Sequence, residues 1–310
     1  MTVSRASASP GRRRRVPVGE TFWAFMFLLP WIIGFIVFTA GPMIYSLYIS
    51  FTDYNVIRPP EIVGLENYET LMTDRRIPQA LENTAFYTVL NVPLTMIFSL
   101  ALAMILLRVG RAAGFFRTAF YLPTVTPAVA VGTLFLLILS GNGLLNRALA
   151  IIGINGPSWL SDPDYVQQGI VIMSLWTLGS TVIIYFAALR NVPAELYEAA
   201  RIDGANSWQQ FRHITVPFIS GALFFTLIVN TIASLQIFAE VFTMFFGLTQ
   251  SSPAQSSALF YVIYLFQRAF EDLDLGYASA MAWLLFVIIL IITAIQIRFS
   301  RRFVYYEGGR

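Results

Sequence analysis

The sequence of 310 residues contains no cysteine, no lysine and a single histidine, His213. Without cysteine the chain can form neither a disulfide nor a thiolate metal site, and one histidine cannot make a multi-histidine site or a histidine relay. Without lysine it cannot carry the G-x-x-x-x-G-K-[ST] loop that binds nucleoside triphosphates. Any ATP hydrolysis on which the chain depends must therefore come from another polypeptide.

Charged residues are scarce as well. They make up 12% of the chain, against roughly 25% in a soluble domain. Hydrophobic residues make up 57%, and the mean hydropathy is +0.67. This balance suits a lipid bilayer, where each span needs roughly 20 apolar residues. The composition predicts an all-α integral membrane protein.

Alternating apolar and polar segments predict about six transmembrane helices. The predicted spans are residues 22–51, 83–107, 118–139, 167–189, 218–244 and 275–297. They form a transmembrane domain, residues 21–298, between a basic tail, 1–20, and a short C-terminal tail, 299–310.

Prolines and glycines predict where these segments bend. Pro30, Gly34 and Pro42 are expected kink points in the first span, and Pro123 and Pro127 are expected to break the third. The segments 52–82 and 140–166 are predicted to be loops. Residues 258–270, in the loop before the last span, are predicted to form an interfacial helix.

The arginines predict how the chain is oriented. With six spans both termini lie on one side, which carries fifteen of the arginines, whereas the other side carries five. Cytoplasmic loops have an excess of basic residues. Both termini and the polar loop 190–217 are therefore expected in the cytoplasm. The five arginines on the other side are Arg58, Arg75, Arg76, Arg147 and Arg268.

The loop 190–217 has the pattern of two short helices joined by a sharp turn. Pro193 suits a first helical turn, and Gly204 falls where a helix end needs a left-handed residue. Ser207 and Gln210 match a capping box that would open the second helix. The residues alone leave two interpretations open: a loop packed on its own bundle, or a stiff hairpin that receives force from a partner.

The same segment resembles the EAA motif of permeases from binding-protein-dependent ABC importers. The family pattern is E-A-A-x₂-D-G-A-x₅-F-x₂-I-x-L-P, where x is any residue. The chain departs from it once, with Val216 in place of leucine. The resemblance implies coupling to an ATPase through the matching residues, which are Glu198, Ala199, Ala200, Asp203, Gly204, Ala205, Phe211, Ile214 and Pro217.

Other segments resemble the carbohydrate-uptake branch of that family, the maltose-type and glycerol-phosphate-type permeases. The resemblance covers most of the chain from about residue 20. It is carried by residues 116–123, 193–198, 234–238, 261–270 and 276–278. The chain departs from the branch at 247–253, where GLTQSSP replaces a frequent Gly-Gly-Pro.

The resemblance implies an ABC type I importer fold and a transport subunit that is not itself an enzyme. It implies three kinds of partner: a second, usually different, permease chain, a dimer of ATP-binding subunits and an external solute-binding protein. No cofactor is expected in this chain, because ATP and Mg²⁺ would be bound by the ATPase, and no nucleic acid is expected. The implied location is the cytoplasmic membrane of a bacterium or archaeon. Glu198 would anchor the hairpin on the ATPase, and Gly204 would set its angle.

Polar residues inside the spans are candidates for a solute pathway, because such residues tend to face a bundle interior. They could hydrogen-bond sugar hydroxyls or, alternatively, hold the helices together. Glu240 is expected near the outer interface. The pathway candidates are Asn230, Thr231, Ser234 and Gln236 in the fifth span and Tyr185 in the fourth.

Other functions remain open. An ABC permease for a polyamine or phosphate would share the motif. A stand-alone secondary transporter would predict buried ionisable residues and inverted repeats. The sequence has few ionisable residues within its spans and no apparent repeat. A membrane enzyme would need a constellation of acids, histidines or metal ligands, and none is apparent.

Overall fold

The computed structural model describes residues 18–247 and 253–300, so the predicted tails lie largely outside it, as do residues 248–252 of the departing segment. The chain divides into two units after Ile49. The described residues of the first unit form α1 (Val18–Phe35), the π-helical turn η1 (Ile36–Ala40) and α2 (Gly41–Ile49). Pro30 lies inside α1, and the change of helix type directly precedes Pro42.

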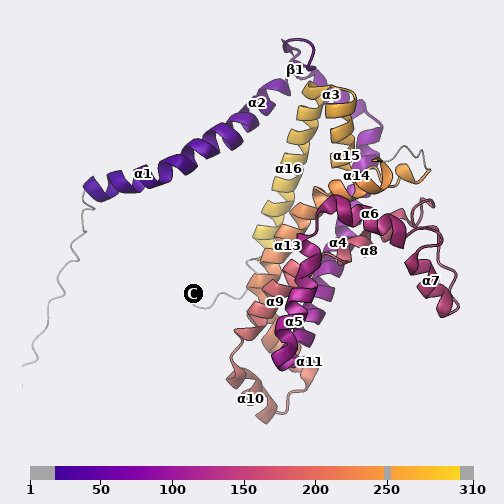
Figure 1. Ribbon diagram of the computed structural model, residues 1–310. Coiled ribbons are helices and arrows are strands. Elements are labelled where there is room, and N and C mark those ends of the chain that lie inside the picture. Colours follow the sequence, from indigo (N-terminus) through magenta and orange to yellow (C-terminus); the bar gives the residue numbers. More distant parts are fainter. Residues whose placement is uncertain (1–17, 248–252, 301–310) are drawn as a thin grey trace, which may run out of the picture. The chain divides into compact units, whose positions relative to one another are not determined.

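The second unit holds the remaining elements (Figure 1). It opens with a two-stranded antiparallel sheet, in which Thr52 pairs with Ile62. Its strands are β1 (Thr52–Asp53) and β2 (Glu61–Ile62). The α-helices are α3 (Glu66–Thr73), α4 (Arg76–Arg108), α5 (Ala113–Tyr121), α6 (Ala128–Ile138), α7 (Leu144–Ile151), α8 (Val166–Leu175), α9 (Gly179–Arg190), α10 (Ala194–Ile202), α11 (Ser207–Gln210), α12 (Val216–Phe218), α13 (Ser220–Leu235), α14 (Ala239–Phe245), α15 (Tyr261–Phe266) and α16 (Leu275–Ser300).

Short 3₁₀ and π segments link several of these helices. The 3₁₀ segments are η2 (Gly110–Ala112), η3 (Leu122–Val125) and η5 (Pro253–Gln255), and the π segments are η4 (Phe211–Thr215) and η6 (Gln267–Glu271).

The membrane-spanning helices agree with the prediction of about six. Four helical stretches in the described residues are long and apolar enough to span a membrane: 25–49, Arg76–Arg108, 220–245 and Leu275–Ser300. Two bent pairs bring the number to six if each pair is one span. The first pair, residues 113–125 and 128–138, bends by 99°, and the second, α8 with α9, bends by 49°. The predicted break at Pro123 and Pro127 is therefore confirmed.

The second unit contains two separate apolar cores. One involves α3, α4, α6, α8, α14, α15 and α16 and includes Tyr87, Phe260 and Met281. The other joins the end of α4 to α5, α9 and the start of α13 and includes Leu106 and Tyr185. The unit is therefore packed in two halves along its length.

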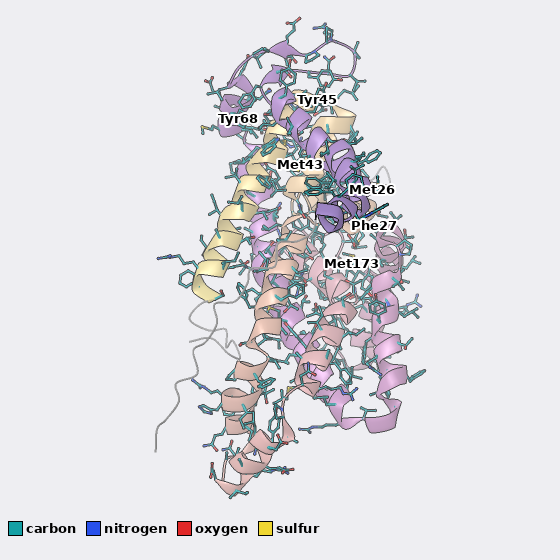
Figure 2. The ribbon with its side chains drawn as sticks, turned by 90° about the vertical axis from the view of Figure 1, so that its left-hand side faces the viewer. Met26, Phe27, Met43, Tyr45, Tyr68 and Met173 are labelled. Atoms are coloured by element: carbon teal, nitrogen blue, oxygen red, sulfur yellow. The ribbon has the colours of Figure 1, made fainter. Side chains whose placement is uncertain are left out.

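Within the second unit, α10 and α11 lie at one end, and β1 and α3 lie at the opposite end (Figure 1). Tyr68 of α3 is seen at that opposite end in Figure 2, where Met173 lies well inside the unit. The burial values agree, because Met173 is only 1% exposed. The helices α10 and α11 form the helical hairpin predicted for residues 190–217, so we call their end the hairpin end. The end that contains β1 and α3 is called the α3 end.

Glycines allow two of the closest backbone contacts. A Cβ on Gly179 would lie 2.0 Å from the Phe120 carbonyl oxygen, so α9 can approach the end of α5 only with glycine there. A Cβ on Gly276 would lie 2.1 Å from the Thr52 carbonyl oxygen. Small residues at helix contacts are typical of membrane bundles, where close packing replaces the hydrophobic driving force.

Three segments that were predicted as loops or surface elements are more ordered than expected. Residues 52–82 contain the β1–β2 hairpin, α3 and the first turns of α4, and residues 140–166 contain α7. The predicted interfacial helix 258–270 corresponds to α15 and η6, and its start is buried: Phe260 and Tyr261 are 0% exposed, whereas Phe270 near the end of η6 is 64% exposed. Within this segment, α15 packs against α4 and α16.

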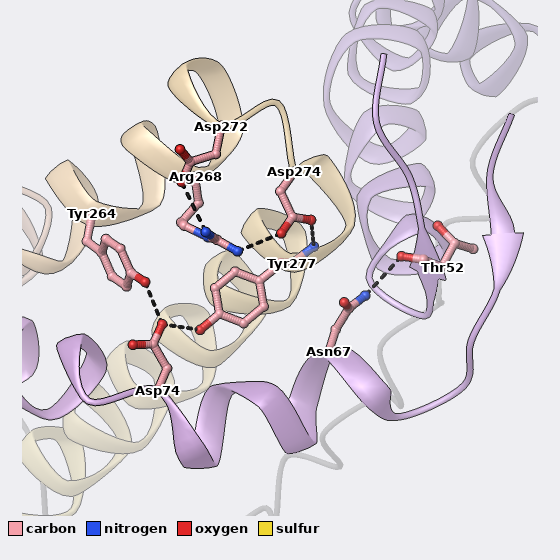
Figure 3. A network of polar contacts seen from close by, with 8 residues as sticks. All are labelled: Thr52, Asn67, Asp74, Tyr264, Arg268, Asp272, Asp274 and Tyr277. Carbon is pink, nitrogen blue, oxygen red and sulfur yellow. Dashed lines mark hydrogen bonds and ion pairs between the residues drawn. The ribbon is translucent and has the colours of Figure 1, made fainter. Parts of the chain in front are cut away.

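A polar network ties together the α3 end (Figure 3). The Asp74 carboxylate, between α3 and α4, accepts hydrogen bonds from the hydroxyls of Tyr264 at 2.5 Å and Tyr277 at 2.7 Å. Arg268 forms ion pairs with Asp272 at 3.0 Å and Asp274 at 2.7 Å. The network therefore links the start of α4 to α15, η6 and α16.

These contacts shift the ionisation of Asp74. Burial alone would raise its pKa, but the hydrogen bonds from Tyr264, Tyr277 and the Arg76 backbone, together with the Arg268 charge, lower the pKa below the ordinary 3.8. Burial and the hydrogen bond to Asp74 raise the pKa of Tyr264 to about 12. The network is therefore built around an ionised Asp74.

We expect Asp74→Asn to lower the free energy of unfolding by about 1–3 kcal/mol, the usual cost of weakening hydrogen bonds to a charged group. Because folding lowers the Asp74 pKa, this stabilisation is present above pH 3.8 and is lost as the pH falls through the lower, folded-state value. Thermal unfolding of the purified protein across this pH range measures both effects. Asp53→Asn, at an exposed strand residue, is the matched control, and an equal loss in both variants would contradict the prediction.

Candidate functional site

The hairpin begins with α10, which ends as the sequence predicted. Gly204 follows it with φ +78°, in the left-handed region. The Ala205 N–H donates to the Ala200 carbonyl at 2.8 Å, and the Gly204 N–H donates to the Arg201 carbonyl at 3.1 Å. This pair of bonds is the Schellman motif, which satisfies the last carbonyls of a helix and turns the chain sharply. The predicted role of Gly204 in the turn is confirmed.

The second helix is capped one residue earlier than predicted. Asn206, not Ser207, is the N-cap: its side chain accepts a bond from the Gln209 N–H at 2.9 Å. The Gln209 side chain accepts one from the Asn206 N–H at 2.8 Å. Ser207 is already the first helical residue, and the Gln210 side chain donates to the Ala205 carbonyl. The Ser207–Gln210 capping box was therefore wrong by one position, because asparagine caps as well as serine.

The residues that match the EAA motif fall into two groups on this hairpin. Ala200, Asp203, Gly204, Ala205 and Ile214 line a hollow of about 330 Å³ between its two arms. Of the other four, Glu198 and Ala199 are exposed on α10, Phe211 stacks on Trp208 with ring centroids 5.5 Å apart, and Pro217 lies in α12.

Two contacts hold the hairpin as one body. The Tyr197 hydroxyl of α10 hydrogen-bonds the Thr215 hydroxyl of η4 at 2.9 Å. Tyr197 and Ile214 also pack against the core that contains Tyr185. The sequence gives no signal for the Tyr197–Thr215 bond, because the two residues are 18 positions apart and belong to different helical segments. The arms are thereby joined to each other and to the bundle.

The tip of the hairpin presents apolar side chains. Ile202 is 87% exposed and Trp208 is 65% exposed. Both lie outside the helices that are able to span a membrane. Large apolar side chains exposed outside the bilayer are typical of a protein-protein contact.

A polar cavity of about 560 Å³ lies deeper in the second unit. Its lining includes Tyr87 and Met173 from one core and Leu178 from the other. The cavity therefore sits where the two packed halves meet.

Three helix breaks converge on this cavity. Its lining includes Ala128, which starts α6 after the 99° bend, and Thr177 and Leu178, which separate α8 from α9. It also includes Gln236 and Phe238, at the ends of the break between α13 and α14. Non-helical backbone at membrane depth is tolerated only where it is buried in protein or lines a watery cavity.

The cavity contains some of the predicted pathway residues but not all of them. Asn230, Ser234 and Gln236 line it. Thr231 does not: its hydroxyl accepts a hydrogen bond from Gln296 of α16 at 2.9 Å. Tyr185 does not either, because it is 0% exposed and its hydroxyl bonds to Thr226.

Lining the cavity and holding helices together are not exclusive roles. The Ser234 hydroxyl accepts a hydrogen bond from the Asn91 amide of α4 at 3.0 Å. The Asn230 amide donates to the Thr181 hydroxyl of α9 at 3.5 Å. The same side chains therefore line the cavity and join helices.

The second span supplies lining residues that the sequence analysis missed. Tyr87, Asn91 and Thr95 of α4 all line the cavity. Their spacing of four residues places them on one helix face, which is a signal that the sequence contained. Glu240, which was expected near the outer interface, is a further lining residue that was not predicted, in the first turn of α14 after the break.

The chemistry available in the cavity is mostly that of neutral hydrogen-bonding groups. Hydroxyls and amides dominate the polar lining, and Tyr87 hydrogen-bonds Ser174 at 2.7 Å. Within the described part of the chain, no group of three acidic, histidine or cysteine residues is placed to hold a metal ion. The arrangement is suited to binding a polyhydroxylated solute.

Comparison with known proteins gives consistent matches. Residues 95–305 match the family described as binding-protein-dependent transport system inner membrane component. The probable ABC transporter permease protein YesP of Bacillus subtilis is 37% identical, covering 92% of each chain. The lactose transport system permease protein LacF of Rhizobium radiobacter is 33% identical, covering 89% of this chain and 93% of LacF.

A solved structure shares the fold. It is a chain of a bacterial ABC transporter that imports the acidic polysaccharide alginate. The TM-score is 0.80 at 25% identity, with 93% of this chain and 98% of that chain covered. A second structure of an alginate transporter, in complex with an alginate-bound periplasmic protein, matches with a TM-score of 0.79 at 25% identity and covers 92% and 96%.

We expect Asn206→Ala to destabilise the second arm of the hairpin by about 1 kcal/mol, the usual value of an N-cap. Hydrogen exchange of the Gln209 amide, which the cap protects, measures this loss. Ser207→Ala is the matched control and should leave exchange nearly unchanged. Faster exchange in the Ser207 variant than in the Asn206 variant would contradict the assignment of the cap.

Proposed function

The chain belongs to the family of inner membrane components of binding-protein-dependent transport systems, and we propose that it forms half of the pathway through which an ATP-driven importer takes up a saccharide. As an ABC permease it is a transport subunit, and the ATPase is a separate subunit. It functions with a second permease and receives its solute from a binding protein.

The observation that carries the proposal is the polar cavity at the junction of three broken spans. In many transporters, solute sites lie near the bilayer midplane and are formed by discontinuous helices. Asn230, Ser234 and Gln236, together with Tyr87 and Asn91 of α4, offer neutral donors and acceptors. These groups match sugar hydroxyls and would not compensate a phosphate charge.

The named relatives favour the same class of solute. LacF is named for lactose, and the permease AmyD of Thermoanaerobacterium thermosulfurigenes is named for starch degradation products. AmyD is 31% identical over 90% of this chain. We assign the class, a saccharide, and not the individual sugar.

The hairpin is the part that we propose to contact the ATPase, which would bind ATP and Mg²⁺. Glu198 is exposed on α10, and Ile202 and Trp208 present apolar surface at the tip. The Gly204 turn and the Tyr197–Thr215 bond make the hairpin a stiff body. A push on it would reach α9 and α13 through their shared core. Glu198 would anchor the hairpin, and Gly204 would keep its angle.

The arginine distribution supports an orientation for the chain. Fifteen of the arginines belong to the hairpin end, its neighbouring loops and the termini. By the positive-inside rule we place the hairpin and both termini in the cytoplasm and the α3 end outside. The proposed location is the cytoplasmic membrane of a bacterium or archaeon.

We expect Gly204→Asp to abolish ATP-driven saccharide uptake in proteoliposomes that contain the complete importer, while the protein still inserts and assembles. The substitution strains a left-handed turn that sets the hairpin angle. Uptake and assembly are measured on the same preparation. The proposed coupling role fails if the Gly204 variant takes up saccharide at the wild-type rate.

Gly153→Asp is the matched control for this experiment. Gly153 has φ +80°, and neither glycine has another group within 4 Å of an added Cβ, so the local strain is alike. Gly153 follows α7 and is not part of the hairpin. Uptake should survive in this variant.

A further inference from the structure

Glu240 is the one charged residue among the described residues that line the polar cavity. No arginine lines the cavity, and the ion pairs found in the described part of the chain both involve Arg268, at the α3 end. The cavity in this chain therefore has a negative charge and no opposing positive one.

The backbone holds Glu240 in a fixed place. It lies in the first turn of α14, two residues beyond the break that ends at Phe238. There α14 packs closely on α6: a Cβ on Gly132 would lie 2.8 Å from the Glu240 carbonyl oxygen and 3.4 Å from its Cα. A larger residue at 132 would push Glu240 out of position. Gly132 is therefore part of what directs this carboxylate.

Glu240 lies within the candidate span 220–245, where a charged side chain needs a reason. Ionisable side chains within spans are costly and tend to mark solute pathways. The helix dipole of α14 favours an acid in its first turn, but that stabilisation does not require the carboxylate to line a cavity. The placement beside three helix breaks points to an effect on the solute.

We propose that Glu240 is a specificity-determining residue that makes the pathway select against anionic saccharides, such as those built from uronic acids. This inference rests on the proposed function and narrows its substrate class. A carboxylate on the solute would meet a carboxylate on the wall with no compensating cation from this chain, and like-charge juxtaposition is unfavourable. Neutral saccharides meet only hydrogen-bonding groups.

The fold likeness to the alginate importer does not settle this point. That importer is named for an acidic polysaccharide, whereas the shared 25% identity concerns the fold of the chain as a whole. Charge selection would instead be set by a few lining residues, and here the charged one is acidic.

The test is equilibrium binding to the complete importer in nanodiscs with Mg²⁺ and a non-hydrolysable ATP analogue, without the binding protein, so that only the pathway discriminates. The probes are neutral trisaccharides of glucose, galactose or mannose, each paired with its counterpart oxidised to the carboxylate at C6. We expect the wild type to bind the best neutral probe at least about tenfold more tightly than its acidic partner. Glu240→Gln should bring this ratio close to one without weakening neutral binding.

Two further variants isolate the charge. Glu240→Asp keeps the carboxylate and should keep the discrimination. Glu82→Gln removes an acid from α4 that is exposed and does not line the cavity, and should leave the ratio unchanged. If Glu240→Gln fails to assemble, the wild type and Glu240→Asp still decide, because equal or tighter binding of acidic probes by either would overturn the inference.

The outcomes separate the inference from the proposed function. Neutral binding with an unchanged ratio in Glu240→Gln overturns only the role of Glu240. Binding of no saccharide in the panel by the wild type overturns the proposed function and the inference together.

Discussion

Backbone groups inside a bilayer must find hydrogen-bond partners within the protein, and the second unit is arranged around this constraint. Lipid offers no donors or acceptors, so an interrupted helix is stable only where its free groups are buried in protein or meet water. Three spans of this chain are interrupted, and residues at all three breaks line one cavity. The same breaks separate the two apolar cores. The cavity and the division of the bundle thus have a single physical cause.

This arrangement links the hairpin to the cavity mechanically. The hairpin is braced by the Tyr197–Thr215 bond and packs on the core that holds α9 and the start of α13. Both helices end or begin at a break that lines the cavity. A displacement of the hairpin can therefore change the width of the pathway while the other core, beside the α3 end, stays packed. A transport cycle needs two such states that differ in their contacts with the ATPase.

The sequence predicted regular features well and local ones less well. Span 275–297 corresponds to α16, and the bend at Pro123 and Pro127 was foreseen, because proline disrupts a helix wherever it lies. The break between α13 and α14 has no proline or glycine to announce it, so the place of Glu240 in the cavity lining was not predicted. The cap at Asn206 was missed because Ser207, beside it, is an equally good capping residue by type. Tertiary contacts bury Tyr261 and keep Tyr185 and Thr231 out of the cavity lining. Such contacts produce no periodic pattern in the sequence.

Cysteine accessibility tests most directly whether the junction of the three broken spans is a water-filled solute pathway. The native chain has no cysteine, so a single introduced thiol reports one position. Ser180 lines the cavity, whereas Val89 of α4 is 74% exposed but lies outside its lining. In the assembled importer, we predict that Ser180→Cys reacts rapidly with a charged, water-soluble thiosulfonate and that Val89→Cys reacts slowly. Equal rates, or no reaction at position 180, would contradict the account.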